Sequence, residues 1–349
     1  MGSGGRARTR AAPAVGVALA GVLLAACATT AVARPAIAGV PTRSISVALS
    51  VVGCTRNDVC VAVGSSTTAV GLAATGEFST PRSPWIPLSL PPVSAPSIAS
   101  IGCGGTSCLV GGSEPRGDLL WSFSATTHQV HVVAPPSGGA GVEAIGCDGR
   151  VCALADAGAA SGGPRWSTTL DGGATWSVPV PLPLAAGDVV TSIACSSAAR
   201  CVLAARDAAR GVLAASTTDG GATWTPLAVP GRWVALTSLT CAATQCRGLA
   251  RTRRASLLVR LRVGGGRWRS STLPGPALAV ACAPGGACVV VGGAGGRPFL
   301  QTRVSGRAAI EPRLRYVPGD LFGVACGTRR CAAIGDTTLL DVPSSLVTS

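Results

Sequence analysis

Fourteen of the fifteen cysteines in this 349-residue chain fall into seven local pairs. Four or five residues separate the partners, and the first cysteines of successive pairs are 49, 44, 48, 46, 41 and 44 residues apart. An even set of cysteines at such spacing predicts a disulfide framework, and a period of this size is typical of repeats that each form a four-stranded sheet. The pairs are Cys54/Cys60, Cys103/Cys108, Cys147/Cys152, Cys195/Cys201, Cys241/Cys246, Cys282/Cys288 and Cys326/Cys331.

Each pair is flanked by two short apolar segments. A branched residue stands two positions before every first cysteine, and the residue between them is Gly or Ala in six repeats, with Thr240 as the exception. Because side chains alternate along a strand, the unit is expected to be strand, tight loop, strand, with the disulfide bridging the two shoulders of the loop. The sequence therefore predicts an all-β, seven-bladed β-propeller over residues 40–345, with a disulfide in the first hairpin of each blade.

The seventh repeat is too short to complete a blade. After Cys331 the chain has room for one further strand, whereas residues 40–50 precede the first repeat and have strand character. We expect this segment to supply the outer strand of blade seven and to close the ring, which removes an exposed sheet edge.

Two segments carry a second pattern. Residues 167–176 read STTLDGGATW and residues 216–224 read STTDGGATW, with a degenerate copy at 264–268. They resemble the Asp-box, or BNR, repeat of sialidase-like propellers. In a hairpin the aspartate would accept hydrogen bonds from the turn, glycine would supply a positive φ, and tryptophan would pack between sheets. The resemblance implies structural roles for Asp171, Gly173, Trp176, Asp219, Gly221 and Trp224.

The N-terminal segment predicts export. A basic stretch and an apolar stretch lead into Leu-Ala-Ala-Cys ending at Cys27, which matches a bacterial lipobox. We interpret residues 1–27 as a signal peptide with Cys27 lipidated, and 28–39 as a flexible linker. A cell-envelope lipoprotein is expected, with a lipid anchor to the membrane. The alternatives are full secretion after cleavage before Gly39, or an uncleaved anchor at 11–33.

Catalytic groups are sparse in the sequence. The two histidines, His128 and His131, are three residues apart in a predicted outer strand, so they should face opposite sides and offer neither a metal pair nor a base for a catalytic triad. Sialidases use a Tyr/Glu pair and three arginines, but Tyr316 is the only tyrosine here and the family's Phe/Tyr-Arg-Ile-Pro motif is absent. These observations predict that the chain is not an enzyme and uses neither cofactor nor metal.

Charge is distributed unevenly. Residues 36–149 hold 4 Arg and 6 acids, whereas residues 150–349 hold 21 Arg and 9 acids. Arginine without any lysine indicates a GC-rich genome, of the actinobacterial kind, and solvated arginine from codon usage is one interpretation. The other is a partner surface on loops of blades four to six. Its candidate residues are Arg206, Arg210, Arg232, Arg251, Arg253, Arg254 and Arg297.

These features favour a non-catalytic cell-envelope propeller that acts as a binding or assembly scaffold and is a monomer. Asp-box propellers that it resembles include photosystem II assembly factors. The expected partner is a protein or an anionic glycan or lipid. Nucleic acid is disfavoured because the chain is exported and has few aromatic residues to interleave with arginine. The alternative is a glycan-binding or glycan-hydrolysing, sialidase-like propeller.

Overall fold

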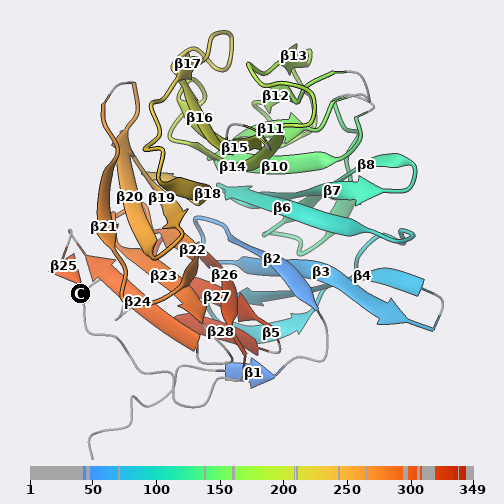
Figure 1. Ribbon diagram of the computed structural model, residues 1–349. Helices are drawn as coiled ribbons and strands as arrows, with labels where there is room; N and C mark the ends of the chain where they lie inside the picture. Colours follow the sequence, from blue (N-terminus) through green and yellow to red (C-terminus); the bar gives the residue numbers. More distant parts are fainter. Residues whose placement is uncertain are drawn as a thin grey trace, which may run out of the picture. The chain divides into compact units, whose positions relative to one another are not determined.

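The computed structural model describes residues 42–342 with gaps at 45–47, 70, 137–138, 159–161, 208, 210, 243, 265, 294–297, 305–306, 309–318 and 337. These residues form 28 strands and no helix, and the strands make seven four-stranded antiparallel sheets. In this part of the chain no helix is long and apolar enough to cross a membrane. The predicted all-β, seven-bladed propeller is confirmed (Figure 1).

In blades one to six the strands follow the order of the chain from the centre outward, and in blade seven the outermost strand is β1 (Thr42–Ser44). Blade one contains β2 (Leu49–Cys54), β3 (Cys60–Thr68), β4 (Gly71–Thr80) and β5 (Ser83–Pro87). Blade two contains β6 (Ser97–Gly104), β7 (Ser107–Glu114), β8 (Gly117–Ser124) and β9 (Val130–Val132). Blade three contains β10 (Val142–Asp148), β11 (Val151–Asp156), β12 (Arg165–Thr169) and β13 (Val180–Pro181). Blades four and five contain β14 (Val189–Cys195), β15 (Cys201–Asp207), β16 (Gly211–Thr217) and β17 (Thr225–Pro226); and β18 (Trp233–Ala242), β19 (Gln245–Thr252), β20 (Ser256–Arg262) and β21 (Arg269–Thr272). Blade six contains β22 (Ala277–Cys282), β23 (Cys288–Gly293), β24 (Pro298–Val304) and β25 (Arg307–Ala308), and blade seven contains β26 (Leu321–Cys326), β27 (Cys331–Gly335), β28 (Thr338–Val342) and β1 (Thr42–Ser44).

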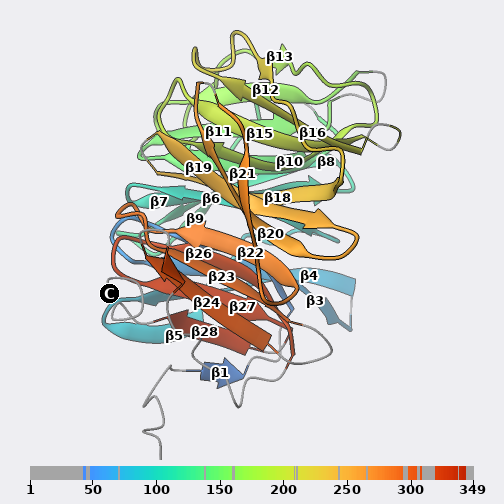
Figure 2. The same ribbon diagram turned by 60° about the vertical axis from the view of Figure 1, so that its left-hand side comes forward.

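The innermost strands form a closed circle of neighbours, β2, β6, β10, β14, β18, β22 and β26, in which β26 returns to β2 (Figures 1 and 2). Blade seven is assembled from both ends of the described chain, because β1 pairs antiparallel with β28. The register places Thr42 opposite Leu340 and Ser44 opposite Thr338. The outer strand of this last sheet thus comes from the segment that precedes blade one.

All seven predicted disulfides are present. They are Cys54–Cys60, Cys103–Cys108, Cys147–Cys152, Cys195–Cys201, Cys241–Cys246, Cys282–Cys288 and Cys326–Cys331. In each blade the two cysteines are direct register partners in the first and second strands. Their Cα atoms lie 4.0–4.1 Å apart, so the bridge joins strands that are already paired. Each closes a loop of only about six residues, for which chain entropy gives about 2 kcal/mol of stabilisation.

The position of the bridge relative to the loop differs from the prediction in three blades. In blades two, three and five the strand pairing continues for one residue pair beyond the disulfide, as Gly104 with Ser107 does in blade two. Cys108, Cys152 and Cys246 are therefore the second residues of β7, β11 and β19, not the shoulders of the loop. Four residues between the cysteines leave room for one more pair around a two-residue turn, the commonest hairpin connection. The loop of blade seven has the same length, but its strand pairing ends at Cys326 and Cys331. The side chains of Cys108, Cys152 and Cys246 are at most 4% exposed and pack between sheets, so they belong to the scaffold and not to a surface site.

Crowding between blades explains the small residue before the first cysteine. A Cβ atom added at Gly53 would lie 2.3 Å from the Sγ of Cys103 and 3.0 Å from Cδ1 of Ile101 in the next blade. At Gly102 it would lie 2.6 Å from Cγ2 of Ile145. Since heavy atoms that are not bonded do not approach this closely, β2 and β6 can pack against the next blade at this spacing only with glycine at these two positions.

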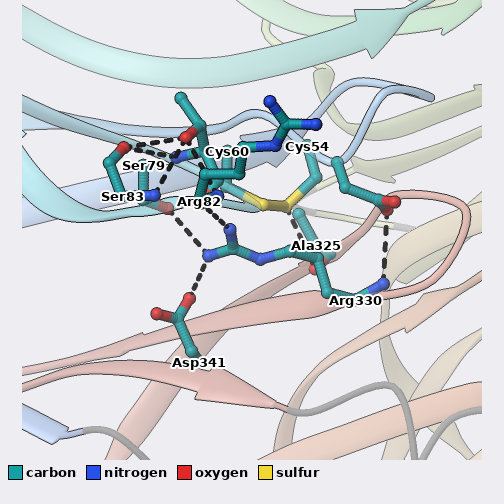
Figure 3. A network of polar contacts seen from close by, with 10 residues as sticks. Cys54, Cys60, Ser79, Arg82, Ser83, Ala325, Arg330 and Asp341 are labelled. Carbon is teal, nitrogen blue, oxygen red and sulfur yellow. Dashed lines mark hydrogen bonds and ion pairs between the residues drawn. A yellow bond between two sulfur atoms is a disulfide. The ribbon is translucent and has the colours of Figure 1, made fainter.

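Blades seven and one are joined by a polar network in addition to their apolar contact. The guanidinium of Arg330, from the loop before β27, donates to the Ser79 hydroxyl at 2.8 Å and to the Thr80 carbonyl oxygen at 2.6 Å, both in blade one (Figure 3). It also forms an ion pair with Asp341 of β28 (Figure 3). Asp58, buried in blade one, accepts from the backbone N–H of Arg329 at 2.8 Å. The junction is therefore held by charge-assisted hydrogen bonds.

Candidate functional site: the two faces and the channel

The hairpins define two faces of the propeller. The cysteine loops and the turns between third and fourth strands lie together, because Gly172 N–H donates to the Arg150 carbonyl oxygen at 3.0 Å and Gly220 N–H donates to the Ala199 oxygen at 2.9 Å. We call this side the cysteine-loop face. The turns between second and third strands and the connections between blades leave the opposite ends of the strands, and we call that side the crossing face.

On the cysteine-loop face, two carboxylates organise the third turns of blades three and four. Asp171 accepts from the Thr175 N–H at 2.9 Å and from the Thr175 and Thr169 hydroxyls at 2.6 and 2.7 Å. Asp219 makes the same set with Thr223 and Thr217. Hydrogen bonds from the Thr175 hydroxyl and amide hold the pKa of Asp171 well below its usual range, and those from Thr223 lower the pKa of Asp219 to about 2.

The glycines and tryptophans of these two turns pack on the preceding blade. Gly173 and Gly221 have φ of +101° and +98°, the left-handed region where glycine is favoured. A Cβ at Gly221 would lie 2.2 Å from Nε1 of Trp166 in blade three. Trp224 meets Trp166 edge to face at 4.8 Å between ring centroids, while Trp176 packs against the apolar cluster between blades two and three. The two glycines and two tryptophans therefore contact the preceding blade, whereas the two aspartates bond within their own turns.

The crossing face carries exposed arginines on blades four and five. Arg206 lies near the end of β15 and Arg251 near the end of β19, Arg253 and Arg254 form the turn between β19 and β20, and Arg232 lies in the turn before β18. All five are exposed, and none forms an ion pair with a described residue. The predicted surface residues Arg210 and Arg297 lie outside the described residues, as do Cys27 and the 28–39 linker.

The carboxylates on this face hold their own loops. Asp118 accepts from the N–H groups of Gly139 and Gly141 at 2.8 and 2.7 Å, and burial raises its pKa. Asp188 accepts from Ala185 N–H at 2.8 Å, and Asp207 accepts from Ala209 N–H at 2.6 Å. Asp188 and Asp207 are buried and Asp118 is half-buried, and all three accept from the backbone, so these acids do not pair with the exposed guanidinium groups.

The central channel is lined by all seven innermost strands and encloses about 280 Å³. At the end of the channel toward the crossing face, polar side chains form hydrogen bonds between neighbouring blades. Glu143 of β10 accepts from Val190 N–H of β14 at 2.7 Å, and the Thr191 hydroxyl donates to the Leu236 carbonyl oxygen of β18 at 2.9 Å. Ser100 accepts from Ile145 N–H at 2.9 Å. Burial is the main cause that raises the pKa of Glu143.

The opposite mouth of the channel is a cavity of about 350 Å³ bordered by the first cysteines of the seven blades. Arg56 of blade one and Asp148 of blade three form an ion pair there. Asp148 and Glu143 are five positions apart on β10, which corresponds to about 17 Å along a strand. Glycosidases of the two-carboxylate type need about 5 to 10 Å between their carboxyl groups, so these two do not form such a pair.

The two histidines do not share an environment. His131 is exposed in β9, whereas His128 lies in the preceding turn, with φ of 57°, rather than in the strand as expected. The ring of His128 stacks on Phe78 of blade one at 4.6 Å between centroids. Tyr316 lies outside the described residues. No cluster of three or more metal-ligating side chains occurs among the residues that the structure describes.

One group of basic residues escaped the sequence-based prediction. The residue after the second cysteine is apolar and buried in six blades, but in blade five it is Arg247. Arg247 is paired in register with Arg260, which is paired with Arg269, so three arginines cross blade five in one row. Comparing the seven repeats position by position, rather than looking for charged loops, would have revealed this departure.

No family model matches the chain, and no curated protein matches it. Solved structures do resemble it. A catalytically inactive virginiamycin B lyase from Staphylococcus aureus with quinupristin is 10% identical with a TM-score of 0.63, covering 86% of this chain and 98% of the lyase. YCF48 bound to D1 peptide is 13% identical with a TM-score of 0.58, covering 86% and 96%. A GH74 xyloglucanase from Xanthomonas campestris is 14% identical with a TM-score of 0.55, covering 86% and 53%.

These similarities show the fold, and they contradict the sequence-based prediction that the chain is not an enzyme. Virginiamycin B lyase is an enzyme, and it is built on the same fold at 10% identity. The prediction went wrong because it judged catalysis by the residues of one family, the sialidases, whereas one fold can carry sites of different chemistry.

Proposed function

We propose that this propeller is an exported binding module that engages an acidic segment of a partner protein through the crossing face of blades four and five. The observation that carries the proposal is the set of exposed arginines there, Arg206, Arg232, Arg251, Arg253 and Arg254, beside carboxylates that are already engaged by backbone N–H groups. Guanidinium groups offer forked donors that match carboxylates, and an uncompensated cluster of them steers acidic partners toward it.

A protein partner is in keeping with the comparisons. YCF48, which shares the fold, was solved bound to D1 peptide. The rigid ring also suits the role, because turns held by packed sheets can be ordered before binding and lose little conformational freedom on association.

The test uses a fluorescein-labelled oligo-glutamate peptide, with fluorescence anisotropy as the measurement. We expect the affinity for the peptide to fall as the salt concentration rises. In the triple variant R251S/R253S/R254S the affinity should be at least about tenfold lower, because several charge-assisted contacts are lost. The control is R82S/R150S/R200S, which removes the same charge from exposed arginines on the cysteine-loop face. Equal losses in both variants, or no loss in either, would refute the proposed surface.

Two further arms separate the other possible partners. Vesicles of anionic phospholipid and purified cell-envelope glycans are offered to the same proteins. If the wild type is retained on the vesicles or on the glycans and does not bind the peptide, and if this retention requires Arg251, Arg253 and Arg254, then the partner is that lipid or glycan and not a protein.

We also propose that the chain reaches the cell envelope through its N-terminal segment and is anchored by a lipid on Cys27. Seven disulfides support export, because such bonds persist in oxidising compartments and are rare in the cytosol. Metabolic labelling with a palmitate analogue should mark the wild type and not the C27S variant. An unlabelled wild type, found in the culture medium, would favour release by cleavage before Gly39.

A further inference from the structure

Blade five contains a second basic feature, on its surface toward blade six. β-strand register places Arg247 of β19, Arg260 of β20 and Arg269 of β21 side by side. The next row on the same surface is Leu249, Leu258 and Ser271, so the arginine row borders two leucines and a serine. We call the arginine row with its surroundings the blade-five groove.

The position of Arg247 belongs to the scaffold in the other blades. Its counterparts are fully buried apolar residues that pack between sheets, namely Val61, Leu109, Ala153, Val202, Val289 and Ala332. Arg247 is half-buried in their place. One of its N–H groups donates to the Gly286 carbonyl oxygen at 2.6 Å and approaches the Cys282–Cys288 disulfide.

The electrostatics of the groove are unfavourable as they stand. Burial, and then repulsion from Arg260, lower the pKa of Arg247. Like charges directly opposite on neighbouring strands destabilise a sheet. None of Arg247, Arg260 and Arg269 has an ion pair with a carboxylate among the described residues. An anion bound beside the row would offset this repulsion.

The space beside the row suits a small oxyanion. A cavity of about 170 Å³ is lined by the three arginines together with Leu258, Ser270 and Ser271. A second cavity, of about 310 Å³, adjoins it and adds Arg262 and Arg267. The arginine side chains supply guanidinium donors, while Leu258 gives the first cavity an apolar wall.

We propose that the blade-five groove is a binding site for a phosphoryl group. A carboxylate presents two oxygens, which one forked guanidinium satisfies, whereas a phosphoryl group presents three or more oxygens and a higher charge that several arginines share. The site lies toward the cysteine-loop end of the strands, away from the crossing-face arginines, and does not depend on the proposed partner surface. Its ligand is a phosphate ester, either free in solution or in a lipid headgroup.

The variant R247L tests the site, because it restores the kind of residue that the other blades carry and should fold. We expect inorganic phosphate and pyrophosphate to raise the Tm of the wild type relative to chloride at equal ionic strength. The rise should disappear in R247L, whose Tm without phosphate should equal or exceed that of the wild type. Calorimetric titration with pyrophosphate should show at least a tenfold weaker Kd for R260S/R269S.

The triple variant R251S/R253S/R254S is the control and should keep the full response to phosphate, even if its binding to the acidic peptide is lost. Glycerol phosphate and phosphatidylglycerol vesicles then distinguish a soluble ester from a headgroup. Equal phosphate-induced shifts in the wild type and R247L, or no shift beyond that of chloride in the wild type, would overturn the proposal.

Discussion

Removing the Arg330 side chain should weaken the junction between blades seven and one. The loss in the free energy of unfolding should exceed that caused by replacing an exposed arginine with alanine. The Arg330 side chain is 13% exposed and its partner Asp341 is 20% exposed. Removing it leaves that carboxylate, the Ser79 hydroxyl and the Thr80 carbonyl oxygen without their charged donor (Figure 3). Breaking one side of a buried ion pair costs about 3–5 kcal/mol, and the remaining water access places R330A near 3 kcal/mol.

The neighbouring residue provides a matched control. Arg329 has a side chain that is 76% exposed and reaches Asp58 only at 3.5 Å, so R329A should cost at most about 1 kcal/mol. Urea unfolding measures both values, and hydrogen exchange should show faster opening of β28 and β2 in R330A than of blades three and four. The double variant R330A/D341A should recover part of the loss, because it removes the unpaired carboxylate. If R330A and R329A unfold at the same urea concentration, the junction is not held as described.

Three other variants test single features of the scaffold. E143A should lower the free energy of unfolding by about 1–3 kcal/mol, because the Val190 N–H loses its acceptor. E143Q keeps an acceptor oxygen and should be at least as stable as the wild type at neutral pH. The reason is that the pKa of Glu143 is raised, so its ionisation opposes folding. Asp219 has a lowered pKa, so its contribution is complete above pH about 4 and is lost as the pH falls through about 2; D219N should flatten the acid side of the stability curve in that range. G102A should cost about 1–3 kcal/mol by overpacking, while G231A, where a Cβ would meet nothing within 4 Å, should stay within about 0.5 kcal/mol of wild type in the same urea assay.

The fold could be predicted because its determinants are local and repeated. A disulfide joins two strands that pair directly, so the spacing of Cys54 and Cys60 already specifies a hairpin. The small residue at Gly53 and its counterparts indicated crowding at the centre, and the structure adds which atoms crowd it. The position of His128 in a turn was missed, because its left-handed backbone and its stacking on Phe78 depend on the neighbouring blade.

The candidate sites were less predictable, since they arise where residues of different strands or blades come together. Arg247, Arg260 and Arg269 are 13 and 9 residues apart in sequence, and only the register of β19, β20 and β21 places them in one row. The same holds for Glu143, whose partner Val190 belongs to the next blade. Charge counting found the exposed arginines of the crossing face, but it could not show that Asp188 and Asp207 are engaged elsewhere.

Hydrogen exchange of the propeller with and without the oligo-glutamate peptide tests the proposed partner surface most directly. Bound peptide should slow exchange at the crossing-face ends of β15, β16, β19 and β20, around Arg206 and Arg251, and leave the cysteine loops unchanged. Protection confined to the cysteine-loop face or to the channel-lining strands would contradict the proposal that this module recognises its partner through the crossing-face arginines.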